Sequence, residues 1–290
     1  MTEIAVLSAL TGLHIVAAER CAMGFENRTE RATLADGRVV IIQRLANRGM
    51  AAHKIRLAQT LPARLAEAGI RAPAVLQADA QATPPFMVRE YIPGEIGAAQ
   101  LATDAGAIAL AEAMGRLLQT IALVKTAGLG LHSGWANPAR LVAQARGQLS
   151  RHGSLIEHAH AAVLEQSIAQ AEPLLAGYPG VFAHGDYCPV NVIVEDGDLQ
   201  RDWGYRQALR LALIDLEFAR VAHPLLDVAW WNWVVRYHHA VRWQVAFPHL
   251  LAAAGIPDTG ATWARITVIQ HLRLLEALDY NAALSPERGA

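Results

Sequence analysis

The sequence is poor in the residues that mark several classes of protein. Its 290 residues include only two cysteines, so neither a disulfide framework nor a four-cysteine zinc site is expected. Aromatic residues make up 6%, charged residues 18%, and the formal net charge is −1. A nucleic-acid partner is not expected, because proteins that bind nucleic acids usually carry an excess of positive charge.

Long hydrophobic runs are absent as well. No uncharged apolar stretch reaches the roughly 20 residues that a membrane-spanning helix needs. The first residues have no basic lead and include Glu3, which argues against a secretory signal. We therefore expect a cytoplasmic protein without a membrane partner. Hydrophobic residues make up 53%, which excludes a disordered chain, and the length favours one large domain or two lobes.

The motifs of several enzyme classes are missing too. The sequence contains no G-x-S-x-G elbow, no Walker A loop, no G-x-G-x-x-G fingerprint and no H-E-x-x-H pair. His158 and His160 do not share a helix face, because residues two apart diverge. Hydrolase, P-loop, Rossmann and zinc-enzyme functions therefore lack their signatures.

What is present divides into a β-rich first part and a mainly helical second part. Short β-like runs are expected at 14–18, 29–34, 38–45, 74–78 and 86–92. Asp36-Gly37, between two of these runs, is a hairpin signal. A helix is expected over 50–68, kinked or divided at Pro62.

From residue 94 onward apolar residues recur at helical spacing. Breaks between helices are expected near Gly153, at Phe247-Pro248 and over 255–260. A short β patch is expected at 181–183, 191–195 and 211–218. The sequence thus predicts an α+β fold with two lobes, residues 1–93 and residues 94–290.

The strongest functional signal lies in two short segments of the second part. HGDYCPVN places Asp186 and Asn191 after one apolar run, and LALIDLEFA places Asp215 at the end of another. An Asp, an Asn and a second Asp at the ends of buried strands can converge on one point. Phosphoryl transfer needs such a set, because one carboxylate orients the incoming hydroxyl while the other two groups hold Mg²⁺.

These motifs resemble those of the aminoglycoside phosphotransferase and choline kinase family, small-molecule kinases with a protein-kinase-like bilobal fold. The family patterns H-G-D-x-x-x-x-N, I-D-W/F-E and G-D-P-x-x-D-L-A correspond here to HGDYCPVN, IDLE and AHPLLDVA. The resemblance implies that Asp186 is the catalytic base and that Asn191 and Asp215 are magnesium ligands. It also implies structural positions near the site for His184, Glu217 and Asp227.

In the first part the resemblance implies a site for ATP or GTP. Gly24 and Asn27 occupy the position of a loop that covers the phosphates. Arg44, near the end of VVIIQRL, is expected to bind the nucleotide phosphates; Gln43 is adjacent but uncharged. Strand alternation allows only one of these two side chains to face the cleft.

The segment PPFMVREYIPGE resembles the hinge between the lobes of such kinases. By position, the carbonyl of Glu90 and the amide of Ile92 would bind the adenine, and Met87 would pack behind it.

Two features depart from the family pattern. The helix after the strand of Arg44 has a single acid, Glu67, too late to pair with that cation. Either Glu26 or Glu30 serves instead, or the pair is absent, as in a nucleotide-binding scaffold without transfer activity. Ala222-His223 stands where Gly-Asp is usual.

The acceptor is expected to be a small molecule bound to the helical part. Aromatic walls are expected from Trp230, Trp231, Trp233 and Tyr237, and contacts to an amine from Glu276 and Asp279. Core packing and a solvated helix face are the alternatives for these residues. An aminoglycoside or another amine-bearing antibiotic is the leading acceptor, with amino alcohols, sugars and macrolides open. A protein kinase is less expected, because AHPLLD follows Asp215 too closely for a long activation segment.

Overall fold

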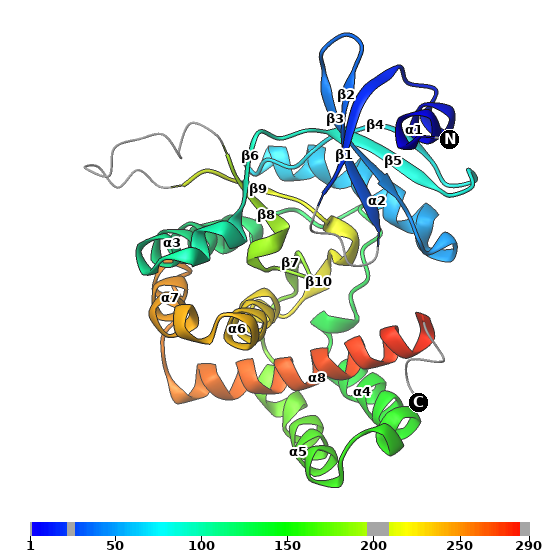
Figure 1. The fold of residues 1–290 in the computed structure, drawn as a ribbon. Helices are drawn as coiled ribbons and strands as arrows, with labels where there is room; N and C mark the ends of the chain where they lie inside the picture. Colours follow the sequence, from blue (N-terminus) through cyan, green and yellow to red (C-terminus); the bar gives the residue numbers. More distant parts are fainter. Residues whose placement is uncertain (1, 22–26, 196–208, 285–290) are drawn as a thin grey trace. The chain divides into compact units, whose positions relative to one another are not determined.

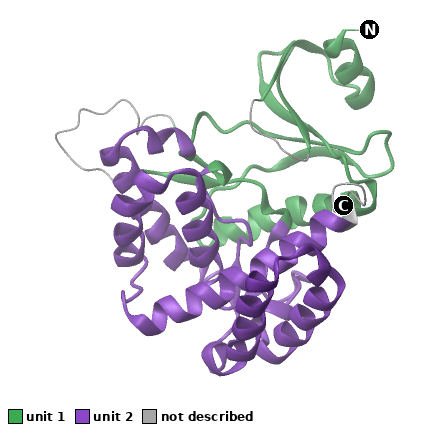
Figure 2. Cartoon of the chain, turned by 60° about the horizontal axis from the view of Figure 1, so that its bottom comes forward, with its two compact units in different colours: residues 1–97, 190–217 green, residues 98–189, 218–290 purple. Residues whose placement is uncertain are grey.

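The structure is a computed structural model that describes residues 2–21, 27–195 and 209–284. The chain forms two compact units, residues 1–97 with 190–217 and residues 98–189 with 218–290 (Figure 2). The first unit thus receives a later segment of the chain in addition to the N-terminal residues. The boundary at residue 93 that the sequence suggests stays a prediction.

The first unit is built mainly from strands. Its elements are α1 (Glu3–Thr11), β1 (Ile15–Arg20), β2 (Arg28–Leu34), β3 (Val39–Arg44), α2 (Arg48–Glu67), β4 (Val75–Asp79), β5 (Phe86–Glu90), β6 (Gly94–Ile96), β8 (Val192–Glu195) and β9 (Leu211–Leu213).

The second unit is built mainly from helices. Its elements are α3 (Asp104–Ile121), α4 (Pro138–His152), α5 (His158–Leu175), β7 (Val181–Ala183), β10 (Arg220–Ala222), α6 (Leu226–His238), α7 (Ala240–Ala253) and α8 (Gly260–Leu284). The expected α+β fold is confirmed.

A five-stranded antiparallel sheet in the order β1-β2-β3-β5-β4 forms the centre of the first unit (Figure 1). Along each strand, successive side chains point to opposite faces of the sheet. Val40 and Ile42 of β3 pack with Leu7 of α1 on one face. Met87 of β5 packs with Ile55 of α2 on the other. The face toward which a β3 or β5 residue points therefore decides which helix it meets.

A smaller sheet in the order β6-β8-β9 completes the first unit. β6 begins at Gly94, whose φ of 148° is unfavourable for other residues. A Cβ atom there would lie 2.1 Å from the backbone oxygen of Val194. Glycine is thus required for β6 to approach β8, and through this sheet the later segment joins the N-terminal one.

Proline interrupts the helices less than the sequence suggests. α2 is one helix with Pro62 inside it, not two pieces. The predicted break at Phe247-Pro248 is wrong, because α7 runs through Pro248 and the break lies at His239. A proline inside a helix removes one backbone hydrogen bond, and burial of Phe247 and Leu250 on the same helix offsets that loss.

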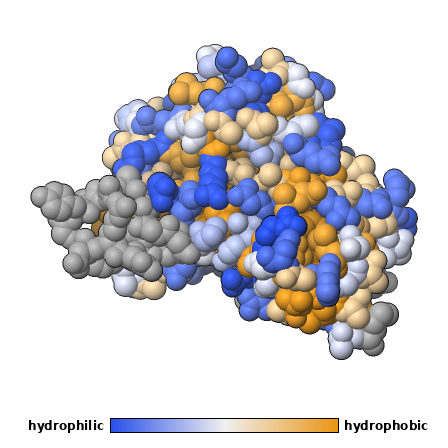
Figure 3. Space-filling view, turned by 90° about the horizontal axis from the view of Figure 1, so that it is seen from above, coloured by the Kyte–Doolittle hydropathy of each residue, from blue (hydrophilic) through white to orange (hydrophobic). Residues whose placement is uncertain are grey.

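Polar and apolar residues are interspersed over much of the surface seen in Figure 3, and apolar residues gather in one area at its lower right. The large apolar side chains that are exposed include Val16, Leu76, Leu123 and Leu155, on different elements or on the connections between them. Within the described ranges, no helix has the length and apolar character that crossing a membrane requires.

Candidate active site

The two predicted magnesium ligands lie at one end of the β8–β9 pair in the first unit. Val192 pairs with Leu213, and the amide of Ile214 donates to the carbonyl of Asn191 at 3.0 Å. Asn191 and Asp215 therefore flank the same end of the ladder. Asp215 has φ of 60°, the left-handed region that residues other than glycine rarely adopt. Such outliers persist where the surrounding structure holds them, often at functional sites.

The donor set of this strand end suits magnesium. A hard cation prefers oxygen ligands, and Mg²⁺ usually binds one or two carboxylates together with phosphates and water. Asn191 offers an amide oxygen and Asp215 a carboxylate. In the described part of the chain, no three His, Cys, Asp or Glu side chains form a group that could hold a metal by themselves. The ion would therefore take its other ligands from a phosphate-bearing substrate and from water.

The segment His184–Asp186 follows β7 in the second unit, and a buried carboxylate fixes it. The Asp227 oxygens accept hydrogen bonds from the amides of His184, at 2.8 Å, and Gly185, at 2.9 Å. His184 is fully buried, and its Nδ1 accepts from the amide of Asp186 at 3.3 Å. Burial raises the pKa of Asp227, while His184 and the two amides oppose that rise. Asp227 and His184 thus hold the backbone on which Asp186 is displayed.

Gly185 permits this loop conformation. Its φ is +81°, and a Cβ atom there would lie 2.1 Å from the backbone oxygen of Phe218. A side chain at this position would force the loop away from Phe218, the last residue of η5 (Leu216–Phe218).

The carboxylate of Asp186 is oriented by α6. The indole Nε1 of Trp230 donates to Oδ1 of Asp186 at 2.5 Å. The guanidinium of Arg273, on α8, lies 4.6 Å from the Trp230 ring centroid and donates to the carbonyl of Gly185 at 3.3 Å. Sequence reasoning placed Trp230 in an aromatic wall and missed this hydrogen bond, because nothing in the sequence gives the register of α6 against the loop.

A buried ion-pair network supports the same loop. Glu276 of α8 accepts from Nη1 of Arg220 at 2.8 and 2.9 Å, lies 3.2 Å from Nη1 of Arg273, and accepts from the indole of Trp135 at 3.1 Å. Burial alone would raise the pKa of Glu276, but the two arginine charges lower it below its ordinary range. These contacts engage the carboxylate that was expected to meet an acceptor amine.

Asp279 is engaged in a similar way, at a more exposed position. It lies 2.8 Å from Nε2 of His152, and Arg151 donates to it at 3.0 and 3.2 Å. Its contacts join α8 to α4, and none of them points to a ligand.

The aromatic residues of α6 separate into two groups. Trp231 is 0% exposed, donates to Sδ of Met114 at 3.3 Å and belongs to the core, so it cannot form a wall open to a ligand. Trp230, Trp233 and Tyr237 stack in series, with ring centroids 5.0 and 5.5 Å apart. This stack, the aromatic ladder, runs from the Asp186 carboxylate to Tyr237, which is 72% exposed.

The residues predicted to contact the nucleotide belong to the first unit, and the structure describes most of them. Gly24 lies outside the described residues, as does Glu26. Asn27 is buried, and its side-chain oxygen accepts from the amide of Ala46 at 3.2 Å. Their roles at a phosphate-covering loop stay predictions.

The hinge-like segment has its own contacts. Met87 is buried against α2, and Ile92 is buried as well. The side chain of Glu90 accepts from Arg71 at 3.1 Å, and its amide donates to the carbonyl of Ala74 at 2.9 Å. The predicted adenine contacts, the carbonyl of Glu90 and the amide of Ile92, stay predictions.

Arg44 lies on the sheet face that carries α1. It forms ion pairs with Glu3 of α1 and with Glu30 of β2, whose side chain is buried. Glu30, one of the two acids considered for it, is thus its partner. Gln43 points to the α2 face, where Nη2 of Arg89 donates to its side-chain oxygen at 3.0 Å.

The α2 face also holds an ion pair that sequence reasoning missed. Nζ of Lys54 lies 2.9 Å from a carboxylate oxygen of Glu217, with side-chain exposures of 3% and 9%. A signal was present: Lys54 shares the buried stripe of α2 with Ala51, Ile55 and Ala58. A lysine in an apolar stripe needs a partner when it is buried.

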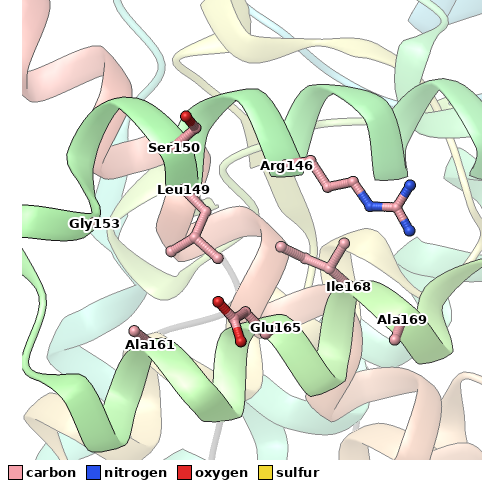
Figure 4. A pocket seen from close by; sticks show the side chains of 8 residues that line it. All are labelled: Arg146, Leu149, Ser150, Gly153, Ala161, Glu165, Ile168 and Ala169. Atoms are coloured by element: carbon pink, nitrogen blue, oxygen red, sulfur yellow. The ribbon is translucent and has the colours of Figure 1, made fainter.

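A separate pocket of about 400 Å³ lies between α4 and α5 (Figure 4). Its lining residues are Arg146, Leu149, Ser150, Gly153, Ala161, Glu165, Ile168 and Ala169. None of the predicted site residues lines it, so it receives no part in the chemistry.

Comparisons with solved structures agree with this fold. The GDP complex of aminoglycoside 2'-phosphotransferase-IIIa matches with a TM-score of 0.75 and 14% identity, over 99% of this chain and 95% of that one. Macrolide 2'-phosphotransferase MphH from Brachybacterium faecium matches with 0.69 and 19%, over 97% and 92%.

Aminoglycoside phosphotransferase APH(3'')-Id from Streptomyces rimosus, in complex with ADP and streptomycin, matches with a TM-score of 0.63 and 18% identity. The match covers 95% of this chain and 99% of that one. No curated protein matches the chain. The model of the phosphotransferase enzyme family matches residues 17–268, which is most of the chain. The chain therefore belongs to the phosphotransferase enzyme family.

Proposed function

We propose that the protein transfers the γ-phosphate of ATP, in a magnesium-dependent reaction, to a hydroxyl group of a small molecule. The observation that carries this proposal is the position of the Asp186 carboxylate. The indole of Trp230 donates to it, and Asp227 fixes its loop through hydrogen bonds from two backbone amides. A carboxylate presented in this way is suited to orient a hydroxyl nucleophile.

The chemistry of each residue follows from its position. Asp186 accepts the hydrogen bond of the acceptor hydroxyl and takes its proton as the oxygen–phosphorus bond forms and ADP leaves. Asn191 and Asp215 hold magnesium, which neutralises charge on the phosphates when it is bound. His184 and Asp227 keep the loop in place. Residues 1–93 are assigned to nucleotide binding, and residues 94–290 to the catalytic loop and the acceptor.

Support for a nucleotide donor comes from similar structures that contain GDP or ADP. ATP is preferred here, with GTP as the alternative. The hinge-like segment supports either purine, because it would bind through the main chain at Glu90 and Ile92.

The acceptor proposal rests on the aromatic ladder beside Asp186. The stacking and Arg273 cover the faces of Trp230 and Trp233, whereas the exposed Tyr237 at the end of the ladder offers a ring to a cationic amine or a sugar. An amine-bearing antibiotic of the aminoglycoside type is therefore the leading acceptor, in which case the reaction would confer resistance in the cytoplasm. Similar structures are aminoglycoside and macrolide phosphotransferases. A small metabolite, such as an amino alcohol or a sugar, is the second candidate.

The test is ATP consumption across a panel of aminoglycosides, macrolides, amino alcohols and sugars, with phosphorylated products identified by mass spectrometry. Asp186→Asn is the matched control, because its amide oxygen can still accept from Trp230. Loss of general base catalysis should lower kcat by about 10²- to 10⁴-fold. If the wild type binds Mg·ATP but consumes ATP no faster than this variant with any acceptor of the panel, the protein is a nucleotide-binding scaffold.

A further inference from the structure

The α2 face of the five-stranded sheet carries two cations that the sequence did not assign. Gln43 is paired with Met87 across β3 and β5, so both point to the same face. Arg89 follows Met87 by two residues and shares that face. Met87 packs on the α2 stripe to which Lys54 belongs. The α2 face thus brings together Gln43, Arg89 and Lys54.

The guanidinium of Arg89 has one N–H donor, Nε, without a partner in the described residues. Nη2 donates to Gln43, but Nε is buried. Buried polar groups without partners are rare in folded proteins, and each needs an explanation, such as a water, ion or ligand that binds there. No ion pair joins Arg89 to a carboxylate of the described chain.

Two carboxylates lie near Arg89 without pairing with it. Burial lowers the pKa of Arg89, and the charges of Asp215 and Glu217 oppose that shift. Asp215 is the proposed magnesium ligand, and Glu217 is held by Lys54. Arg89 therefore lies within electrostatic reach of the end of the first unit where phosphates and metal are expected.

Arg44 also has a buried Nε without a hydrogen-bond partner in the described residues, but it differs from Arg89 in its sheet face and in its ion pairs. It points to the α1 face, and two carboxylates, Glu3 and Glu30, already balance its charge. A guanidinium bound in this way has less positive potential to offer a triphosphate. Its contacts instead attach α1 to the sheet.

We propose that Arg89 is the cation of the first unit that binds the nucleotide phosphates, with Gln43 orienting its guanidinium. The Lys54–Glu217 pair positions the segment that carries Asp215. In this pair the helix supplies the cation and the I-D-L-E segment supplies the acid. The resemblance led us to expect the acid on the helix, paired with a cation on the preceding strand. This inference rests on the proposed function and names the residue that binds the phosphates.

The experiment measures Kd for Mg·ATP and for adenosine by titration calorimetry with the full chain. Arg89→Gln removes the charge but keeps an amide donor for Gln43. It should weaken Mg·ATP binding by roughly tenfold to a hundredfold, as expected for lost charge-assisted hydrogen bonds to phosphate. Adenosine affinity should change less than about threefold, because adenosine has no phosphate.

Two further variants sharpen the comparison. Arg89→Lys keeps the charge without the fork of donors, so its affinity should fall between wild type and Arg89→Gln. If Arg89→Gln does not fold, the lysine variant tests the proposal by itself. Wild-type affinity of that variant for Mg·ATP would then count against the proposal. Arg44→Gln with Glu30→Gln removes the competing ion pair without leaving a buried carboxylate unpaired, and should keep wild-type affinity.

The outcomes are distinguishable. If wild type binds no purine nucleotide, the proposed function fails and takes this inference with it. If wild type binds Mg·ATP and Arg89→Gln binds it equally well, only the inference fails. Loss of ATP binding in the double variant alone would assign the role to Arg44 instead.

Discussion

His223 is expected to make the stability of the second unit depend on pH. Its Nδ1 accepts a hydrogen bond from the amide of Leu225 at 3.1 Å, just before α6 begins. The ring is buried beside Tyr178, and its Nε2 has no hydrogen-bond partner in the described residues. Burial, with a smaller contribution from the charge of Arg265, lowers the pKa of His223 to about 4, from an ordinary 6.5.

The sign of the effect follows from this depression. Between pH 6.5 and pH 4 the unfolded chain binds a proton at His223 that the folded chain does not. The stability that the neutral ring provides is therefore complete above pH 6.5 and is lost as the pH falls. The gap of about 2.5 pH units, at about 1.4 kcal/mol each, corresponds to about 3 kcal/mol in full. About 2 kcal/mol of it should be lost between pH 7.5 and pH 5.

The assay is urea unfolding at several pH values, followed by tryptophan fluorescence. Every tryptophan except Trp203 lies in the second unit, so the signal reports on that unit. The matched variant is His223→Asn, whose side-chain oxygen can still accept from Leu225 but does not titrate. Other titrating groups are common to both proteins and cancel in the difference. A difference in unfolding free energy that stays constant from pH 7.5 to pH 5 would refute the reasoning.

Three further predictions concern the loop of Asp186. Trp230→Phe removes the indole donor and should lower kcat by roughly tenfold to a hundredfold with little change in KM for ATP, measured by steady-state kinetics; unchanged kcat would contradict the orienting role. Glu276→Gln leaves two buried guanidinium groups without their carboxylate and should cost about 3 kcal/mol in urea unfolding, whereas a neutral effect would show the network to be dispensable. Gly185→Ala should lower Tm by several degrees, because a Cβ meets the Phe218 carbonyl; a wild-type Tm would show that the loop can shift.

The sequence predicted the fold class because its patterns were local. The hairpin at Asp36-Gly37, period-two runs in the first part and helical spacing in the second each require only neighbouring residues. α1 and β6 were not predicted. β6 is three residues long and exists only through its pairing with β8, which lies about a hundred residues later in the chain.

The candidate site was partly predictable for a related reason. HGDYCPVN and IDLE mark Asp186, Asn191 and Asp215 as candidates by residue type and spacing, and the family resemblance implies their roles. The choice between Gln43 and Arg44 needed the identity of the sheet face, which depends on where α1 and α2 pack. Trp231 and Glu276 are residue types that often bind ligands. In the structure Trp231 is buried and Glu276 pairs with arginine, so both have structural roles that the sequence does not show.

The path of the chain between the two units has a consequence for any attempt to divide the protein. The chain crosses from one unit to the other after residues 97, 189 and 217. A fragment ending near residue 97 would lack two of the three strands of the smaller sheet, together with Asn191 and Asp215. The middle crossing falls between Asp186 and Asn191, five residues apart, so their Cα atoms are tethered within about 18 Å in every conformation. A cut in this short segment would separate the proposed catalytic carboxylate from both proposed magnesium ligands.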